Sequence, residues 1–141
     1  MKYTGKIQFF FQKLIRRIRY AEGKSLYRVA GLIRVTAKRT MRKRAGPSKA
    51  PKPPHVHTEM GLREIYFSVF GNHAIIGPVK FPGSNQYNEP VPHVHEFGGT
   101  YTSRFYYNHF PERPYMSVAL KKLHEKGLIS REFSAVMAKV L

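Results

Sequence analysis

Residues 91–120, VPHVHEFGGTYTSRFYYNHFPERPYMSVAL, decide how the rest of this chain is organised. The stretch joins a histidine and glutamate cluster to a glycine pair at 98–99, an aromatic run and a proline-flanked motif at 111–114. Two interpretations are open at this point. The cluster is either a chemical site or part of a structural junction that builds an assembly interface.

The positive charge of the chain is unevenly distributed. Lys and Arg number 25 against 8 acidic residues, all of them Glu, for a formal net charge of +17. Sixteen of the basic residues lie in residues 1–52, where Glu22 is the only acid, and the remainder is nearly neutral. Because such dense like charges repel one another, we expect the N-terminal third to meet nucleic acid, an acidic protein surface or an anionic membrane.

Two segments of this basic third have a helical apolar periodicity, residues 6–20 and residues from Ser25 to about Arg44. Their apolar stripes are Ile7, Phe10, Phe11, Leu14 and Ile18, and then Leu26, Ala30, Ile33, Ala37 and Met41. We expect Gly23 to interrupt the helices, Ser25 to cap the second, and cations to fill its last turn. The first stripe is rich in Phe, so we expect it to pack on protein, within the subunit or between subunits, and not on a membrane.

The composition also bounds the class of protein. Residues 7–18 are too short and too charged to span a bilayer, and no small-residue cleavage site follows them. The absence of cysteine excludes disulfides and thiolate metal sites. A length of 141 residues with 42% hydrophobic content predicts a single soluble intracellular domain.

Proline and strand patterns organise the middle of the chain. Residues 45–57 hold four prolines, which predicts an extended arm or an ordered loop. Residues 62–70 alternate as a strand with both faces largely covered, and a Gly-Asn turn returns the chain along residues 73–77. Further prolines make residues 78–92 a second irregular crossing.

Helical signals return after this part. Pro114 suits the first turn of a helix to about Lys126, Gly127 ends it, and Ser130 can cap a last short helix through Leu141. The order of elements predicts an α+β fold, in which a small antiparallel β-sheet (62–110) is flanked by the long helical N-terminal part and the C-terminal helices.

His93, His95 and Glu96, with His55 and His57, are the cluster that most resembles a metal site. In an extended strand, His-x-His points both rings to the same side, so a pair can share one zinc ion. A complete site needs three or four ligands, and no pattern indicates that the two distant loops meet. We therefore favour structural roles for these histidines and expect no metal and no cofactor.

Catalytic motifs are absent from the sequence. The chain has no cysteine nucleophile, no G-x-S-x-G elbow, no P-loop and no G-x-G-x-x-G. Its carboxylates are mostly in basic surroundings, where ion pairing is the simpler use. We expect that the protein is not an enzyme.

Nucleic-acid binding has more support. Lys and Arg along the two helices, with Tyr20 and Tyr27 between them, could neutralise several phosphates. Phe105, Tyr106 and Tyr107 could stack on bases, or belong to a core or interface as alternating strand residues. Since no recognised nucleic-acid-binding signature accompanies the charge, we expect any such contact to be non-specific.

Several short motifs also follow one another in a familiar order. They are Pro53-Pro54-His55 with Met60-Gly61-Leu62-Arg63-Glu64-Ile65, then Ile76-Gly77-Pro78, Glu96-Phe97-Gly98-Gly99-Thr100, and Pro111-Glu112-Arg113-Pro114-Tyr115-Met116 through Ala119-Leu120. This order resembles the head–tail joining, or tail-completion, proteins of long-tailed phages and prophages, often labelled minor tail or virion morphogenesis proteins. The resemblance covers about residues 24–141, with His95 in place of the usual Leu and Val118 where a second Pro is common.

The resemblance implies a non-enzymatic virion component whose fold is related to tail-tube and tail-terminator proteins. Such proteins form rings, usually sixfold, in the neck between the head-side connector and the tail, and they assemble in the host cytoplasm. The implied partners are further copies of the chain, the connector or adaptor, the tail terminator or tail-tube proteins, and packaged DNA, without a membrane. The alternative is a small basic nucleic-acid-binding protein of ribosomal or nucleoid type.

Three sets of residues are expected to matter for this role. The structural junction comprises Glu96, Phe97, Gly98, Gly99, Pro111, Arg113 and Pro114, with a sharp chain reversal at the glycines and Arg113 paired to Glu96 or Glu112. The basic surface, toward an acidic neighbouring ring or DNA, comprises Arg34, Lys38, Arg39, Arg42, Lys43 and Arg44. A proline-rich arm (45–61) with Pro53, Pro54 and His55 would wrap around neighbouring subunits.

Overall fold

The computed structural model describes residues 4–56, 62–79, 91–102 and 107–140, without the side chains of residues 4–10, 101, 102, 107, 108 and 140. The elements are α1 (Thr4–Thr40), β1 (Ile65–Phe70), β2 (His73–Pro78), α2 (Val91–Phe97), β3 (Gly99–Thr102), β4 (Tyr107–Phe110), α3 (Met116–Glu125) and α4 (Leu128–Val140). The predicted α+β class with a long N-terminal helix is confirmed. The single predicted sheet is instead two separate antiparallel pairs, β1–β2 and β3–β4.

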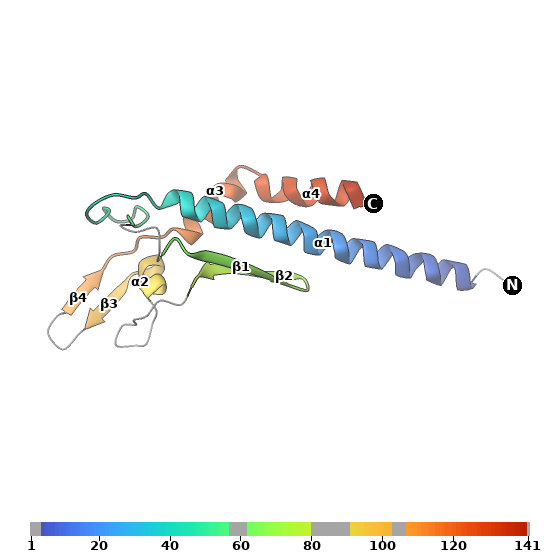
Figure 1. Ribbon diagram of the computed structural model, residues 1–141, viewed down its shortest axis with the longest axis horizontal. Coiled ribbons are helices and arrows are strands. Elements are labelled where there is room, and N and C mark those ends of the chain that lie inside the picture. Colours follow the sequence, from blue (N-terminus) through green and yellow to red (C-terminus); the bar gives the residue numbers. More distant parts are fainter. Residues whose placement is uncertain (1–3, 57–61, 80–90, 103–106, 141) are drawn as a thin grey trace.

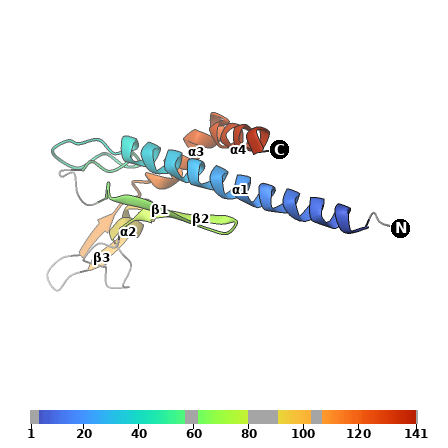
Figure 2. The same cartoon turned by 45° about the vertical axis from the view of Figure 1, so that its right-hand side comes forward.

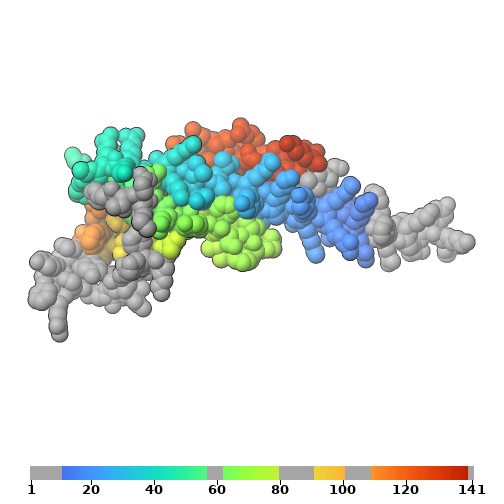
Figure 3. Space-filling view, viewed as in Figure 1, coloured from blue at the N-terminus to red at the C-terminus, as the bar shows by residue number. Residues whose placement is uncertain are grey.

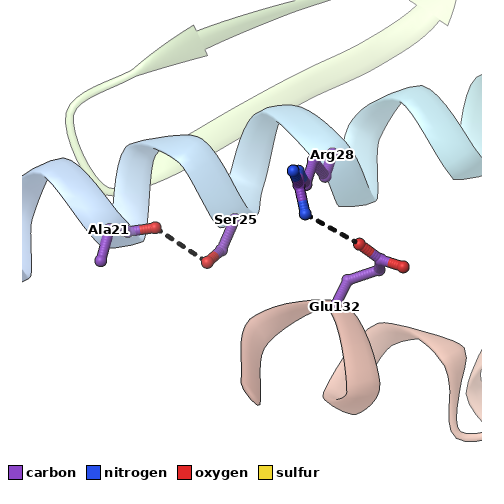
Figure 4. Close-up of polar contacts among 4 residues, drawn as sticks. All are labelled: Ala21, Ser25, Arg28 and Glu132. Carbon is purple, nitrogen blue, oxygen red and sulfur yellow. Dashed lines mark hydrogen bonds and ion pairs between the residues drawn. The ribbon is translucent and has the colours of Figure 1, made fainter. Parts of the chain in front are cut away.

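One continuous helix, α1, replaces the two helices that the sequence predicted. Gly23 does not interrupt it, because a helical glycine costs only about 1 kcal/mol relative to alanine and the surrounding turns are anchored by packing. Ser25 is not a cap: its buried hydroxyl donates to the Ala21 carbonyl one turn earlier, at 2.8 Å (Figure 4). The close-up also shows the ion pair of Arg28 with Glu132, which ties α1 to α4. Arg28 Nη1 lies 3.8 Å from Glu132 Oε2.

The end of α1 lies at Thr40 and not near Arg44. The Val56 amide donates to the Arg42 carbonyl at 3.0 Å, and Lys43 forms an isolated parallel bridge with Val56. Since Val56 occupies the backbone of residues 42 and 43 with these contacts, residues 42 and 43 do not continue the helix. The last-turn cations are therefore Lys38 and Arg39.

The C-terminal half of α1 lies in a three-layer arrangement. Helix α1 is itself the middle layer: helices α3 and α4 lie on one side of it and the β1–β2 hairpin on the other, in both views (Figures 1 and 2). Two clusters fill these contacts: Ala37, Met41, Val56, Ile65, Tyr115 and Ala119 in one, and Val29, Ile33 and Leu123 in the other. The buried α1 residues recur at steps of four. Because a helical turn has about 3.6 residues, this spacing rotates the apolar stripe slowly around the helix, from one layer toward the next.

The β1–β2 hairpin forms as predicted, with Ile65 opposite Pro78 and Phe70 opposite His73. Its faces differ, contrary to the prediction that both are covered. Ile65 and Phe67 face α1, and the Phe67 ring meets the Tyr27 ring edge-on at 5.0 Å. The opposite face is exposed, because α1 packs against only one of the two faces of the hairpin.

The C-terminal helices follow the predicted order with small shifts. Helix α3 begins at Met116, and Gly127 ends it with φ +62°, its amide bonded to the His124 carbonyl. Helix α4 begins directly afterward at Leu128, so Ser130 lies inside its first turn and is not its cap. A helix, α2, occupies residues 91–97, where the sequence predicted irregular and extended chain. Most of the predicted irregular crossing, residues 80–90, lies outside the described residues.

Candidate functional site

The junction between α2 and α3 is held by one carboxylate, that of Glu96. Helix α3 begins with Tyr115 at its N-cap, which supplies no side-chain cap. Instead, Glu96 Oε2 accepts the amides of Tyr115 and Met116 at 2.9 and 3.0 Å, and Oε1 accepts the Ser117 amide at 2.8 Å. These are amides that the first turn leaves without a helical partner, and the negative charge also complements the helix dipole. Glu96 thus caps a helix that starts about twenty residues further along the chain.

The electrostatics of the junction follow from this arrangement. Burial acts to raise the pKa of Glu96, but hydrogen bonds from the Ser117 side chain and the three amides outweigh it, so the pKa lies below its ordinary value. Burial, with the Glu96 charge nearby, raises the pKa of Tyr115. Burial and the Arg113 charge lower the pKa of His95. The junction therefore contains an ionised Glu96 beside a neutral Tyr115 at physiological pH.

Gly98 and Arg113 close the same junction. Gly98 has φ +72°, and an added Cβ would lie 3.2 Å from both the Glu112 amide nitrogen and the Phe110 carbonyl oxygen. The Arg113 amide donates to the His95 carbonyl at 2.8 Å, and its Nε donates to the Ser48 carbonyl at 3.1 Å. Arg113 was predicted to pair with a glutamate. It instead ties the junction to the loop after α1, while Glu96 is bonded to the start of α3.

That loop is the proline-rich segment at residues 45–56. The bridge to Val56 closes it, Pro54 and Ser48 are buried, and His55 Nδ1 lies 3.1 Å from the Gly46 carbonyl. The sequence predicted either an extended arm or an ordered loop. In its described part, the segment is an ordered loop.

The histidines predicted as possible metal ligands do not form the expected pair. Because residues 91–97 are helical, His93 and His95 point to different sides of α2. His93 stacks against Phe97 with ring centroids 4.7 Å apart, whereas His95 turns a buried Nδ1 inward. Among the described residues no cluster of three or more His or Glu could hold a metal ion. His57 lies outside them, as do Phe105, Tyr106 and the side chain of Tyr107.

The predicted basic surface is divided among different environments. Arg34 Nε donates to the Ile65 carbonyl of β1 at 2.7 Å, and its guanidinium lies 5.7 Å from the Tyr66 ring centroid. Lys38 is partly buried, and burial and the charges of Arg34 and Arg63 lower its pKa. The exposed members are Arg39 on α1 and Arg42, Lys43 and Arg44 in the loop beyond it. These six residues do not form one helix face.

A different set of residues, four cations and two tyrosines, does lie on one exposed face of α1. We call this set the basic ridge; it comprises Lys13, Arg16, Arg17, Tyr20, Lys24 and Tyr27, all exposed. Their spacing of three and four residues places them together only if the helix runs unbroken through Gly23. The sequence predicted a break at that glycine, so it placed the basic residues and Tyr20 and Tyr27 on two separate helices and not on one continuous face. The sequence signal that could have indicated one continuous helix face is that the spacing of three and four residues continues across Gly23.

Exposed apolar side chains gather at two separate places. One is residues 11–20 of α1, which we call the N-terminal projection; there Phe11 is 57% and Ile15 47% exposed. The N-terminal end of α1 extends past α4 and the β1–β2 hairpin (Figures 1 and 3). The other is the open hairpin face, comprising Tyr66, Phe70 and Ile75, which are 57%, 52% and 63% exposed. Both are large apolar groups left in water, which is typical of surfaces that contact a partner.

Comparisons with models of known protein families, with curated proteins and with solved structures found no match. In the described part of the chain, no helix has the length and apolar character needed to cross a membrane.

Proposed function

We propose that this protein is a structural subunit of a tailed-phage neck, a tail-completion or head–tail joining component that forms a ring, usually sixfold in such proteins, between the head connector and the tail. The ordered resemblance of residues 24–141 to that family supports the location. The neighbours would be the connector or adaptor on one side and the tail terminator or tail tube on the other. The role is non-enzymatic and needs no cofactor.

The observation that carries the assembly role is the pair of unlike apolar surfaces on one chain. The N-terminal projection presents Phe11 and Ile15, and the open hairpin face presents Tyr66, Phe70 and Ile75. A contact between two different surfaces of identical copies is heterologous, and it closes into a ring when the rotation per subunit is a whole fraction of a turn. Residues 65–79, which include the open hairpin face, contain no Lys, Arg or Glu of their own.

Assembly of the purified full chain tests this proposal. We expect size-exclusion chromatography with light scattering to show a concentration-dependent closed oligomer, visible as rings by negative-stain microscopy. The double variant Phe70→Ser/Ile75→Ser and the double variant Phe11→Ser/Ile15→Ser should each remain monomeric with unchanged circular dichroism. Leu120→Ser is the matched control, because Leu120 is exposed but lies on α3, away from both surfaces.

A wild-type chain that stays monomeric at high concentration, or a control variant that disrupts assembly as strongly as the other two, contradicts the proposal. The neck location has its own test. Reversing the charges of Arg39, Arg42, Lys43 and Arg44 should block head–tail joining while the subunit stays folded, and normal infectious particles would refute that role. Steep salt-dependent DNA binding without any ring would favour the alternative, a small basic nucleic-acid-binding protein.

A further inference from the structure

The basic ridge is a straight, strongly charged surface that the assembly proposal does not use. From Lys13 to Tyr27 it spans fourteen residue steps, or about 21 Å along the helix axis. Its cations lie on the side of α1 away from Phe11, Leu14, Ile15 and Ile18, since residues three and four apart share a helix face. The projection therefore has an apolar side and a basic side.

The charge of the ridge is not balanced by acids of its own face. Glu22 is the one acid in the described part of α1, and its position in the helical repeat puts it with the apolar side. Within the described residues, the structure pairs none of Lys13, Arg16, Arg17 and Lys24 with a carboxylate, whereas Arg28, just beyond, meets Glu132. Lys24 Nζ lies 5.7 Å from the Tyr20 ring centroid, so even this lysine is held on the ridge by an aromatic ring.

The partner that fits this surface is a regular polyanion. Protein–protein interfaces are depleted of lysine and of charge at their centres, so four cations with no interleaved acid are atypical of one. A duplex offers phosphates along a straight path, and 21 Å corresponds to about six base pairs at 3.4 Å each. An α-helix about 10–12 Å wide also matches a major groove of about 12 Å. Tyrosine hydroxyls and Arg guanidinium groups are common phosphate contacts.

We infer that the basic ridge of α1 binds the phosphate backbone of double-stranded DNA without sequence specificity. The biological setting rests on the proposed neck role, in which DNA passes through the ring; the binding itself does not depend on assembly. The apolar side of the projection would contact the neighbouring copy, and the basic side would face the DNA. The predicted surface at Arg42, Lys43 and Arg44 is a different part of the molecule.

The test is the salt dependence of binding to a fluorescein-labelled 30-base-pair duplex of random sequence, measured by anisotropy with the full chain. Each phosphate contact adds about 0.9 to the steepness of the slope of log affinity against log salt. If the four ridge cations each contact one phosphate, raising the salt from 50 to 200 mM should weaken binding about 150-fold. Arg16→Gln/Arg17→Gln should make the slope shallower by about 1.8. Arg16→Lys/Arg17→Lys should keep the wild-type slope, because the charge is retained.

The matched control is Lys49→Gln/Lys52→Gln, which removes the same charge from exposed loop positions and should leave the slope unchanged. The inference would be overturned if the salt slope became shallower by the same amount in the ridge and control variants, or did not change in either. So would displacement of the duplex by poly-glutamate at equal charge concentration, which would indicate an acidic protein partner. Light scattering of the same samples without DNA reports assembly separately, so a failed ring and a failed DNA contact are distinguishable.

Discussion

Removing the Glu96 carboxylate should destabilise the whole fold, although Glu96 belongs to a seven-residue helix. We expect Glu96→Ala to leave three amides of the first turn of α3 without their acceptor. This turn contains Tyr115, which is 1% exposed and packs in the cluster with Met41 and Ile65. The local loss therefore reaches the contact between α1, β1 and α3.

The magnitude follows from the three hydrogen bonds. The Ser117 amide is exposed and can bond to water instead, so only the two part-buried amides lose their partner fully. A hydrogen bond to a charged group contributes about 1.5–3 kcal/mol, and part of this is recovered by solvent, so we expect a loss of about 3 kcal/mol for Glu96→Ala. Glu96→Gln keeps an acceptor but loses the interaction of the charge with the helix dipole, and should cost about 1–2 kcal/mol.

The assay is urea unfolding of the full chain at fixed protein concentration, followed by circular dichroism. Glu22→Ala is the control, because Glu22 is an exposed glutamate on α1. A Glu96→Ala variant no less stable than this control would refute the capping argument.

The same carboxylate predicts a pH dependence with a definite sign. Because the pKa of Glu96 is lowered in the folded state, its ionised form stabilises the fold fully above the ordinary glutamate pKa of about 4.3. This contribution is lost as the pH falls through the lowered pKa. The difference in unfolding free energy between wild type and Glu96→Gln should therefore be largest near neutrality and shrink in acid. A difference independent of pH would show that charge is not what matters.

Four other substitutions test the packing around these sites by the same unfolding measurement. Gly98→Ala should cost about 2–3 kcal/mol, because it adds a Cβ at φ +72° against backbone atoms 3.2 Å away. Gly23→Ala should instead stabilise by about 0.5–1 kcal/mol, because Gly23 lies in a helix with open space around it. Equal effects of the two substitutions would contradict the backbone argument. Ile65→Ala should cost about 3 kcal/mol, since the side chain is fully buried between α1 and α3, and a loss below 1 kcal/mol would mean that the site collapses without a cavity. Glu132→Gln should cost less than about 1 kcal/mol, and the loss should vanish at high salt, because its pair with Arg28 is partly exposed.

The local elements of this fold were largely predictable. Alternation in residues 62–70 and the Gly-Asn turn indicated the first hairpin, whose first strand begins at Ile65, and Gly127 marked the end of α3. These features depend on side chains adjacent in the chain, whose periodicity and backbone preferences are legible in the sequence. The glycine pair after Glu96 likewise indicated a chain reversal, which Gly98 makes.

The relations between distant segments were not predictable in the same way. The sequence marked Glu96 as part of a junction, but its bonds to residues 115–117 exist because the β3–β4 hairpin returns the chain to the same place. Periodicity also could not show that α1 runs through Gly23, since a glycine of modest cost breaks or spares a helix according to the packing around it.

The sequence by itself determined that the N-terminal third is helical, basic and amphipathic, because charge and periodicity are properties of the chain. Only the tertiary structure decided which parts of that helix remain in water. The other helices and the first hairpin stop short of the N-terminal end of α1, so the projection stays exposed while Ala37 is buried. The reason is that burial depends on where α3, α4 and the first hairpin stop, which no residue of α1 encodes.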